Sequence, residues 1–222
     1  MKYVLILMSS LLIGVTPYIR AAETSASIVT TDTSQSLLLL QQQWARINYK
    51  LTDDAKTNAF ISLLEKATKL HENNPDNAEL LIWTGIIQSS TAGAKGGIGA
   101  LKYAKKARKS FEQALRINEN ALNGSALTSL GVLYHKVPGW PIGFGSDKKA
   151  EKLLTRALEI NPDGIDPNYF YAEFLFDNHQ YQQAMTYIAN AKAAPARPNR
   201  PVADKGRRAE VMALEAKILA KL

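Results

Sequence analysis

The chain has 222 residues, of which 46% are hydrophobic, and it carries a formal net charge of +7 and no cysteine. This length allows one or two domains with a sizeable core. The absence of cysteine excludes disulfides, lipid attachment at a cysteine and a thiol nucleophile. The modest positive charge does not argue for a nucleic-acid partner.

The N-terminal residues have the pattern of a secretory signal peptide. Lys2 is followed by residues 3–15, which carry no charge, and small residues follow at Ala21 and Ala22. A short basic start, an apolar run and small residues at its exit are typical of a cleavable export signal. The apolar run is too short to cross a bilayer as a helix, which needs about 20 residues.

We therefore expect residues 1–21 to form a signal peptide that is cleaved after Ala21, with Ala22 and Ala26 as alternatives. An uncleaved N-terminal anchor is the competing interpretation. Cleavage removes Lys2 and Arg20, which lowers the formal charge from +7 to +5. Export predicts a periplasmic or secreted protein with no stable membrane span after cleavage.

Residues 22–34 are small and polar, and they predict a flexible leader. A helix is expected to begin near Ser34 and to carry Leu37 to Leu40 and Trp44. The next helix is expected to end near His71, before the breaker at Pro75. We interpret it as the second half of a degenerate first repeat.

A helix-pair pattern then recurs three times within a predicted repeat domain over residues 35–196. Small residues occupy positions where two helices cross closely, and larger apolar residues fill the grooves between the helices. Such an array binds other molecules more often than it transforms them. The positions that carry the pattern are Leu81, Gly85, Ala107, Phe111 and Ala114, then Leu127, Leu130, Gly131, Tyr134, Ala150, Leu154, Ala157 and Pro162, and finally Ala172, Leu175, Tyr181, Ala184, Ile188 and Ala191.

The spacing of the repeats predicts two insertions. Breaker positions fall at Pro75, Glu119, Pro162 and Ala196, so the units are 44, 43 and 34 residues long. The excess in the longer units lies between the paired helices, at residues 89–99 and 136–146. Equivalent loops of a solenoid line up along one edge. We therefore expect the two insertions to be neighbours that form a shared rim.

These residues resemble tetratricopeptide repeats over roughly residues 55–196. The resemblance implies an all-α, TPR-like helical-hairpin solenoid. Residues 133–145 and 161–170 carry a narrower resemblance to exported bacterial repeat proteins, which are similar to the T-component of TRAP-type periplasmic transporters. That resemblance implies pairing with a substrate-binding protein, although no cysteine is present for the lipid anchor that is typical of this component.

Residues 197–222 are predicted to be a linker and a C-terminal capping helix. The proline-rich stretch 193–201 cannot be helical throughout. A helix from about Val202 to Leu222 would cover the last exposed groove of the array. The excess of Lys and Arg from Lys192 to Lys221 is interpreted as a solvated helix with cations near its C-terminal end.

The insertion 136–146 holds the most distinctive candidate residues, Trp140 and Phe144. They either tuck over the groove as core aromatics or form the lip of a binding site. The concave surface, formed by the first helix of each pair, supplies the remaining candidates. These candidate binding residues are His135, Ile82, Ile86, Tyr169, Glu173 and Phe176. The partner would be another envelope protein or a peptide segment, or alternatively a small hydrophobic ligand.

No constellation of residues predicts catalysis. The three histidines lie far apart, and no Gly-x-Ser-x-Gly elbow occurs. The glycine-rich residues 89–99 lack a Gly-Lys-Ser/Thr ending and so do not indicate a phosphate site. Asp166 before Pro167 is interpreted as a helix cap rather than a calcium ligand. The sequence thus predicts a binding protein with no metal and no cofactor, and an enzyme is the weakest of three function classes.

Overall fold

The computed structural model describes residues 18–222, with side chains from Thr33 onward except that of residue 98. Two units are distinguished, Met1–Ser36 and Leu37–Leu222, and each is considered by itself. The predicted signal peptide falls mainly outside the described residues and stays a prediction. Residues 22–34, expected to be a flexible leader, have helical backbone instead. No Gly or Pro occurs between Tyr18 and Lys50 to interrupt a helix there.

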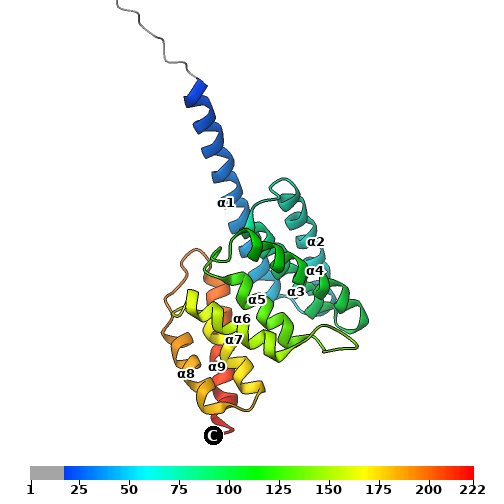
Figure 1. Ribbon diagram of the computed structural model, residues 1–222, viewed down its shortest axis with the longest axis vertical. Coiled ribbons are helices and arrows are strands. Elements are labelled where there is room, and N and C mark those ends of the chain that lie inside the picture. The colour runs from blue at the N-terminus through cyan, green and yellow to red at the C-terminus, as the bar shows by residue number, and fades with distance from the viewer. Residues whose placement is uncertain (1–17) are drawn as a thin grey trace, which may run out of the picture. The chain divides into compact units, whose positions relative to one another are not determined.

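The described residues form nine helices and no strand, which confirms the all-α prediction (Figure 1). The helices are α1 (Tyr18–Lys50), α2 (Asp53–Glu72), α3 (Ala78–Lys95), α4 (Gly97–Ile117), α5 (Ser125–Lys136), α6 (Asp147–Ile160), α7 (Ile165–Asp177), α8 (Tyr181–Ala193) and α9 (Pro201–Leu219).

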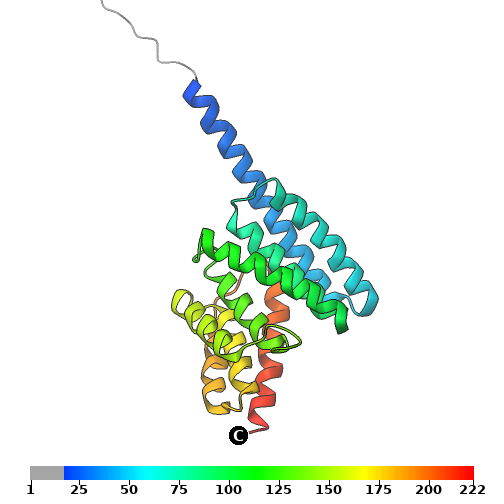
Figure 2. The same cartoon turned by 45° about the vertical axis from the view of Figure 1, so that its right-hand side comes forward.

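Helices α3 to α8 form three antiparallel hairpins, each of which packs on the next (Figure 2). The first helices of the hairpins, α3, α5 and α7, also contact one another in sequence, and α9 continues this row against α7. A row of first helices on one side is the arrangement of a helical-hairpin solenoid. The unit Leu37–Leu222 is therefore an all-α repeat solenoid that ends in a capping helix.

Glycine is required where the paired helices cross. A Cβ atom on Gly85 would lie 2.5 Å from the Phe111 ring, and one on Gly131 would lie 2.8 Å from Leu154. Phe111 is fully buried, and Leu154 is 1% exposed. The small-and-large pattern of the sequence thus corresponds to close crossings within hairpins α3–α4 and α5–α6.

The first predicted insertion is not a glycine-rich loop. Helix α3 continues to Lys95 and α4 begins at Gly97, so the extra residues lengthen the two helices. The stretch before Gly96 contains no proline, and its alanines favour a helix. Gly96 and Gly97 make the turn with φ of 61° and 58°, which is a backbone conformation that glycine adopts readily.

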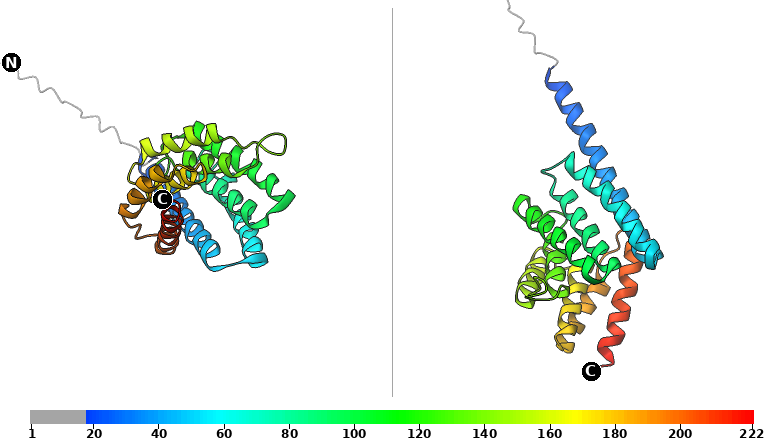
Figure 3. Two further views of the ribbon diagram at one scale, coloured as in Figure 1. Left: turned by 90° about the horizontal axis from the view of Figure 1, so that it is seen from below. Right: turned by 90° about the vertical axis from the view of Figure 1, so that its right-hand side faces the viewer.

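Helix α9 packs on α7 and α8 and also reaches the beginning of the solenoid. Its Val211, Leu214 and Ile218 are buried in the same core cluster as α7 and α8. Near its start, Gly206 lies against the ring of Tyr49 at the end of α1. Figure 3 shows the ribbon of α9 in two further views. We call residues 197–207 the closure segment because they join the last hairpin to α1. Across residues 18–222, no helix is long and apolar enough to cross a membrane.

Candidate functional site

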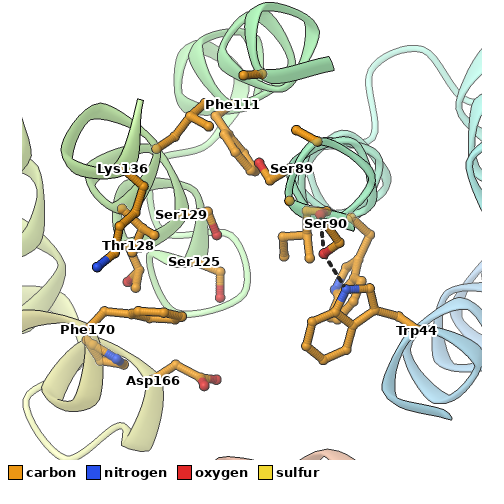
Figure 4. Close-up of a pocket in the computed structure, with 18 of the residues that line it drawn as sticks. Trp44, Ser89, Ser90, Phe111, Ser125, Thr128, Ser129, Lys136, Asp166 and Phe170 are labelled. Carbon is orange, nitrogen blue, oxygen red and sulfur yellow. Dashed lines mark hydrogen bonds between the residues drawn. The ribbon is translucent and has the colours of Figure 1, made fainter. Parts of the chain in front are cut away.

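A partly open cavity of about 900 Å³ is lined by the first helices α3, α5 and α7, by parts of α1 and α4, and by the closure segment (Figure 4). Its volume falls within the range of about 300–1,000 Å³ that is usual for small-molecule sites. Apolar and small side chains make up most of its wall. The wall includes Trp44, Trp83, Ile86, Ala92, Ala100, Leu101, Ala104, Phe111, Leu122, Val132, Leu133, Val137, Ile165 and Phe170.

Aromatic residues from distant parts of the sequence form opposite sides of the cavity. The indole of Trp44 donates a hydrogen bond to Ser90 Oγ at 2.8 Å and packs edge-on against Trp83. Figure 4 shows Trp44 on one side of the space and Phe170 on the other, with Ser129 of α5 between them. This arrangement offers an apolar chamber with a few hydroxyl groups.

The described residues contribute four cations and one carboxylate to the cavity wall. They are Lys136, Arg197, Arg200, Arg207 and Asp166. Three of the cations belong to the closure segment, so the positive charge is concentrated where that segment meets the cavity. The cavity is thus apolar over most of its wall and basic along one part of it.

Two of these arginines are bound by carboxylates. Asp166 accepts hydrogen bonds from Arg197 at 2.6 Å and from Arg207 at 2.8 Å. Arg207 also donates to Glu210 at 2.6 Å, and Arg197 donates to Asp204 at 2.9 Å. Arg207 and Asp204 are buried, at 8% and 9% exposed. The prediction that these cations lie on a solvated helix is therefore wrong for Arg207.

Asp166 is the second residue of α7, which is preceded by Gly164 at the cap position. Because Gly164 occupies the cap position, Asp166 is not the helix cap that the sequence suggested. Its carboxylate joins Arg197 and Arg207 instead. Burial alone would raise the pKa of Asp166, but the charges of Arg207, Arg197 and Arg200 hold this pKa below its ordinary value. The carboxylate is thus ionised at neutral pH and links α7 to the closure segment.

Arg200 differs from the other arginines of the closure segment. It has no ion pair with a carboxylate in the part of the chain that the structure describes, and its Nε is buried without a hydrogen-bond partner. Its guanidinium lies over the ring of Trp83, 4.9 Å from the centroid. Burial, followed by the charge of Arg197, lowers the pKa of Arg200. The charge of Asp166 opposes this shift, but none of the described carboxylates forms an ion pair with Arg200.

The two insertions in the repeats line the same cavity. The first contributes Ala92, Gly93 and Gly97, and the second contributes Val137 and Pro138, with Ile142 beside them. We expected the two insertions to be neighbouring loops that form a shared rim. Both contribute to the cavity wall, but the first contributes helical residues rather than a loop.

The second insertion forms an ordered loop with an exposed tip, residues 138–143, which we call the hairpin tip. Phe144 anchors the loop, because its ring packs edge-on against Tyr134 and lies under the Arg108 guanidinium. Trp140 is 89% exposed, and Ile142 is 71% exposed. The two aromatic residues thus follow different alternatives. Phe144 packs against the helices, whereas Trp140 is exposed to solvent.

The remaining candidate residues of the concave surface have different surroundings. Only Ile86 lines the cavity. Ile82 is fully buried in the core, so it is not accessible as we expected. Tyr169 is 8% exposed and lies beneath Arg207. Phe176 packs against Tyr181.

His135 and Glu173 belong to a polar cluster between hairpins α5–α6 and α7–α8. His135 bridges Asp147 at 2.7 Å and Asp177 at 2.9 Å. Lys136 binds Asp177 at 2.7 Å and Glu173 at 3.3 Å. These pairs satisfy the side chains within the protein. No group of three His, Cys, Asp or Glu residues with the geometry of a metal site is found among the residues from 33 to 222.

Sequence reasoning missed most of the cavity wall. Trp44 and Trp83 were available as aromatic signals, but one precedes the recognised repeats and the other lay outside the recognised pattern. Arg197, Arg200 and Arg207 were noticed only as an excess of charge. Their spacings of three and seven residues fit a helical period, but Pro198 and Pro201 argue against one helix that carries all three.

Comparisons with known proteins support the repeat fold. Residues 148–201 match the tetratricopeptide repeat family model. Among solved structures, the chain is similar to TTC0263, a thermophilic TPR protein of Thermus thermophilus, with a TM-score of 0.55 and 16% sequence identity. That similarity covers 85% of this chain and 99% of the other. No curated protein matches the chain.

Proposed function

We propose that this protein is a non-catalytic binding module of the bacterial envelope that docks another envelope protein through the hairpin tip. The observation that carries the proposal is the exposure of Trp140 and Ile142 on one ordered loop. Exposed tryptophan is enriched among residues that dominate protein–protein binding energy. The tetratricopeptide-like fold supports the same class of function, and the predicted signal peptide motivates the location.

Backbone hydrogen bonds hold the hairpin tip in place. Gly145 N donates to Pro138 O at 2.9 Å, and Gly143 N donates to Gly139 O at 2.9 Å. Ser146 N donates to Tyr134 O at 2.8 Å, which fixes the end of the loop to α5. A preorganised loop loses little conformational entropy on binding. The tip is therefore suited to present Trp140 and Ile142 to a partner.

The test is site-specific photocrosslinking in cells from a benzophenone side chain placed at Ile142. We expect crosslinks to one envelope protein, and we expect Trp140→Ala to abolish them. A matched control is a benzophenone at Met212 of α9, which is 65% exposed and lies away from the tip. Equal crosslinking from both positions, or none from Ile142, would contradict the proposal.

A second candidate function is favoured by the cavity. We propose, as the alternative, that the protein is a small-ligand-binding accessory component of a periplasmic transporter of the TRAP type. The support is an apolar chamber of about 900 Å³ and the narrower sequence resemblance. Native mass spectrometry of protein isolated from the periplasm tests it. A mass shift that disappears on denaturation is expected, whereas a ligand-free protein that also takes up no added amphiphile would remove this candidate.

A further inference from the structure

We propose that the cavity binds an amphiphile with one apolar chain and an anionic head group, and that Arg200 holds the head group. This inference goes beyond docking at the hairpin tip and rests on the second candidate function, for which it names the class of ligand. It follows from the distribution of apolar surface and charge on the cavity wall and from an unpaired polar atom there.

The shape of the wall favours a small amphiphile over a protein segment. The closure segment crosses the concave side, where it is fixed by Arg207 to Asp166 and by Tyr49 Oη to Glu210 Oε2 at 3.3 Å. Gln42 Nε2 also donates to Asn199 O at 3.3 Å. The closure segment therefore narrows the concave side to a partly open pocket, which leaves less room for a folded partner. The apolar wall of this pocket is suited to a hydrocarbon chain.

The positive charge of the cavity wall favours an anionic head group. The four cations on the wall face one carboxylate, Asp166, which is already shared by Arg197 and Arg207. Lys136 is paired with Glu173 and Asp177, which are not part of the cavity wall. Arg200 is the cation that remains without a carboxylate among the described residues. An anionic head would supply the missing partner.

An unpaired polar atom supports the same assignment. Arg200 Nε is buried and makes no hydrogen bond to any of the described residues. Buried donors without partners are costly, and a charged donor more so. The stacking of Arg200 on Trp83 orients its guanidinium but offers no acceptor for its N–H groups. A carboxylate or phosphate accepts from such a planar group through two oxygens.

Binding is measured by isothermal titration calorimetry with decanoate, decyl phosphate and decan-1-ol, each below its aggregation concentration. The first two probes distinguish a carboxylate from a phosphate head, and the alcohol has the same chain without a charge. We expect at least one anionic probe to bind about tenfold or more tightly than the alcohol, because hydrogen bonds to charged groups are the stronger ones.

Two variants and one control assign the site. Arg200→Met is expected to weaken the anionic probe about tenfold or more and to leave decan-1-ol unchanged. Ala104→Phe is expected to fill the chamber and abolish binding of all probes. Arg46→Met, which removes an exposed arginine of α1, is expected to have no effect. Circular dichroism and thermal melts establish that each variant is folded.

The outcomes separate this inference from the function on which it rests. Equal binding of the alcohol and the anions, unchanged in Arg200→Met but lost in Ala104→Phe, would overturn the anionic head and leave a ligand-binding cavity. Absence of binding by every probe would overturn both. Binding that survives Ala104→Phe would place the ligand outside the cavity and would also overturn the inference. If Ala104→Phe does not fold, Ala100→Leu on the same wall replaces it.

Discussion

The closure segment and the hairpin tip depart from a simple repeat in opposite ways. In the closure segment, residues 197–207, the charged side chains of Asp204 and Arg207 are buried, at 9% and 8% exposed. In the hairpin tip, residues 138–143, apolar side chains are in solvent, and Trp140 is 89% exposed. A buried charge stabilises a fold only when its partners are complete, whereas an exposed apolar side chain contributes little to folding. The first region should therefore govern stability, and the second should govern recognition.

The largest effect is expected from Arg207→Met. This change removes the guanidinium that joins Asp166, Glu210 and the ring of Phe170. Breaking a buried ion pair typically costs about 3–5 kcal/mol. Because Arg197 still binds Asp166 in this variant, we expect a loss of about 3 kcal/mol in the free energy of unfolding. That loss corresponds to a fall in Tm of about 6–12 °C for a domain of this size.

Differential scanning fluorimetry and urea unfolding measure this effect. Lys205→Met is the matched control, because Lys205 is exposed on the same helix. An equal Tm for Arg207→Met and the parent protein would show that the buried charges do not stabilise the closure segment. The closure segment would then not differ from the hairpin tip in its effect on stability.

The next effect concerns the contact between α9 and α1. In Gly206→Ala the new Cβ would meet the Tyr49 ring at 2.5 Å. A clash of this kind costs about 1–3 kcal/mol, which is offset in part by the gain of about 1 kcal/mol in helix propensity. We expect a net loss of about 1 kcal/mol.

A double-mutant cycle isolates that contact. Combining Gly206→Ala with Tyr49→Leu should restore part of the stability, because the ring that clashes is gone. Additive losses measured by urea unfolding would mean that the two residues do not press on each other in solution.

A smaller effect on stability is expected when the pH is lowered. The pKa of Asp166 and the pKa of Asp204 are both held below the ordinary value in the folded protein, in each case because arginine neighbours outweigh the opposing effect of burial. As the pH falls, these two carboxylates are therefore protonated at a higher pH in the unfolded chain than in the folded protein. The stability that these carboxylates contribute is present above the unfolded-state value of about 4 and is lost as the pH falls through the folded-state pKa.

We expect the difference in Tm between the parent protein and Asp166→Asn to shrink as the pH falls from about 6 to about 3. Thermal melts across this range measure it. A difference that stays constant with pH would contradict an ionised Asp166 in the closure.

The smallest effect on stability is expected at the hairpin tip. Trp140→Ala and Ile142→Ala should each change the free energy of unfolding by less than about 0.5 kcal/mol, since exposed side chains lose few contacts. Urea unfolding checks this value. A loss above about 1 kcal/mol would show that the tip is part of the core and would remove its distinction from the closure segment.

The repeat framework could be predicted because its signals are local. Ala107, Phe111, Ala157, Ala184 and Ile188 follow a helical period, and all five are fully buried. Proline at positions 138 and 141 correctly indicated a loop in the second insertion. In the first insertion the glycines misled, because alanine and the absence of proline let α3 continue to Lys95.

The cavity could not be predicted in the same way because it is built from distant residues. Asp166 meets Arg207 across 41 positions of sequence, and Trp44 meets Ser90 across 46. The periodicity of residues within one helix does not predict a contact between two distant helices. The unpaired state of Arg200 is likewise a property of its surroundings, which only the folded arrangement defines.

The position of α9 has a consequence for biosynthesis. It is the last of the described helices to leave the ribosome, yet it contributes to the wall beside α1 and α3. Until it arrives, the hairpins that precede it can form, but their inward apolar surfaces remain open to water and to other chains. Completion of the cavity wall is thus a late event in the folding of each chain, and a chain that stops before α9 would leave this apolar surface uncovered.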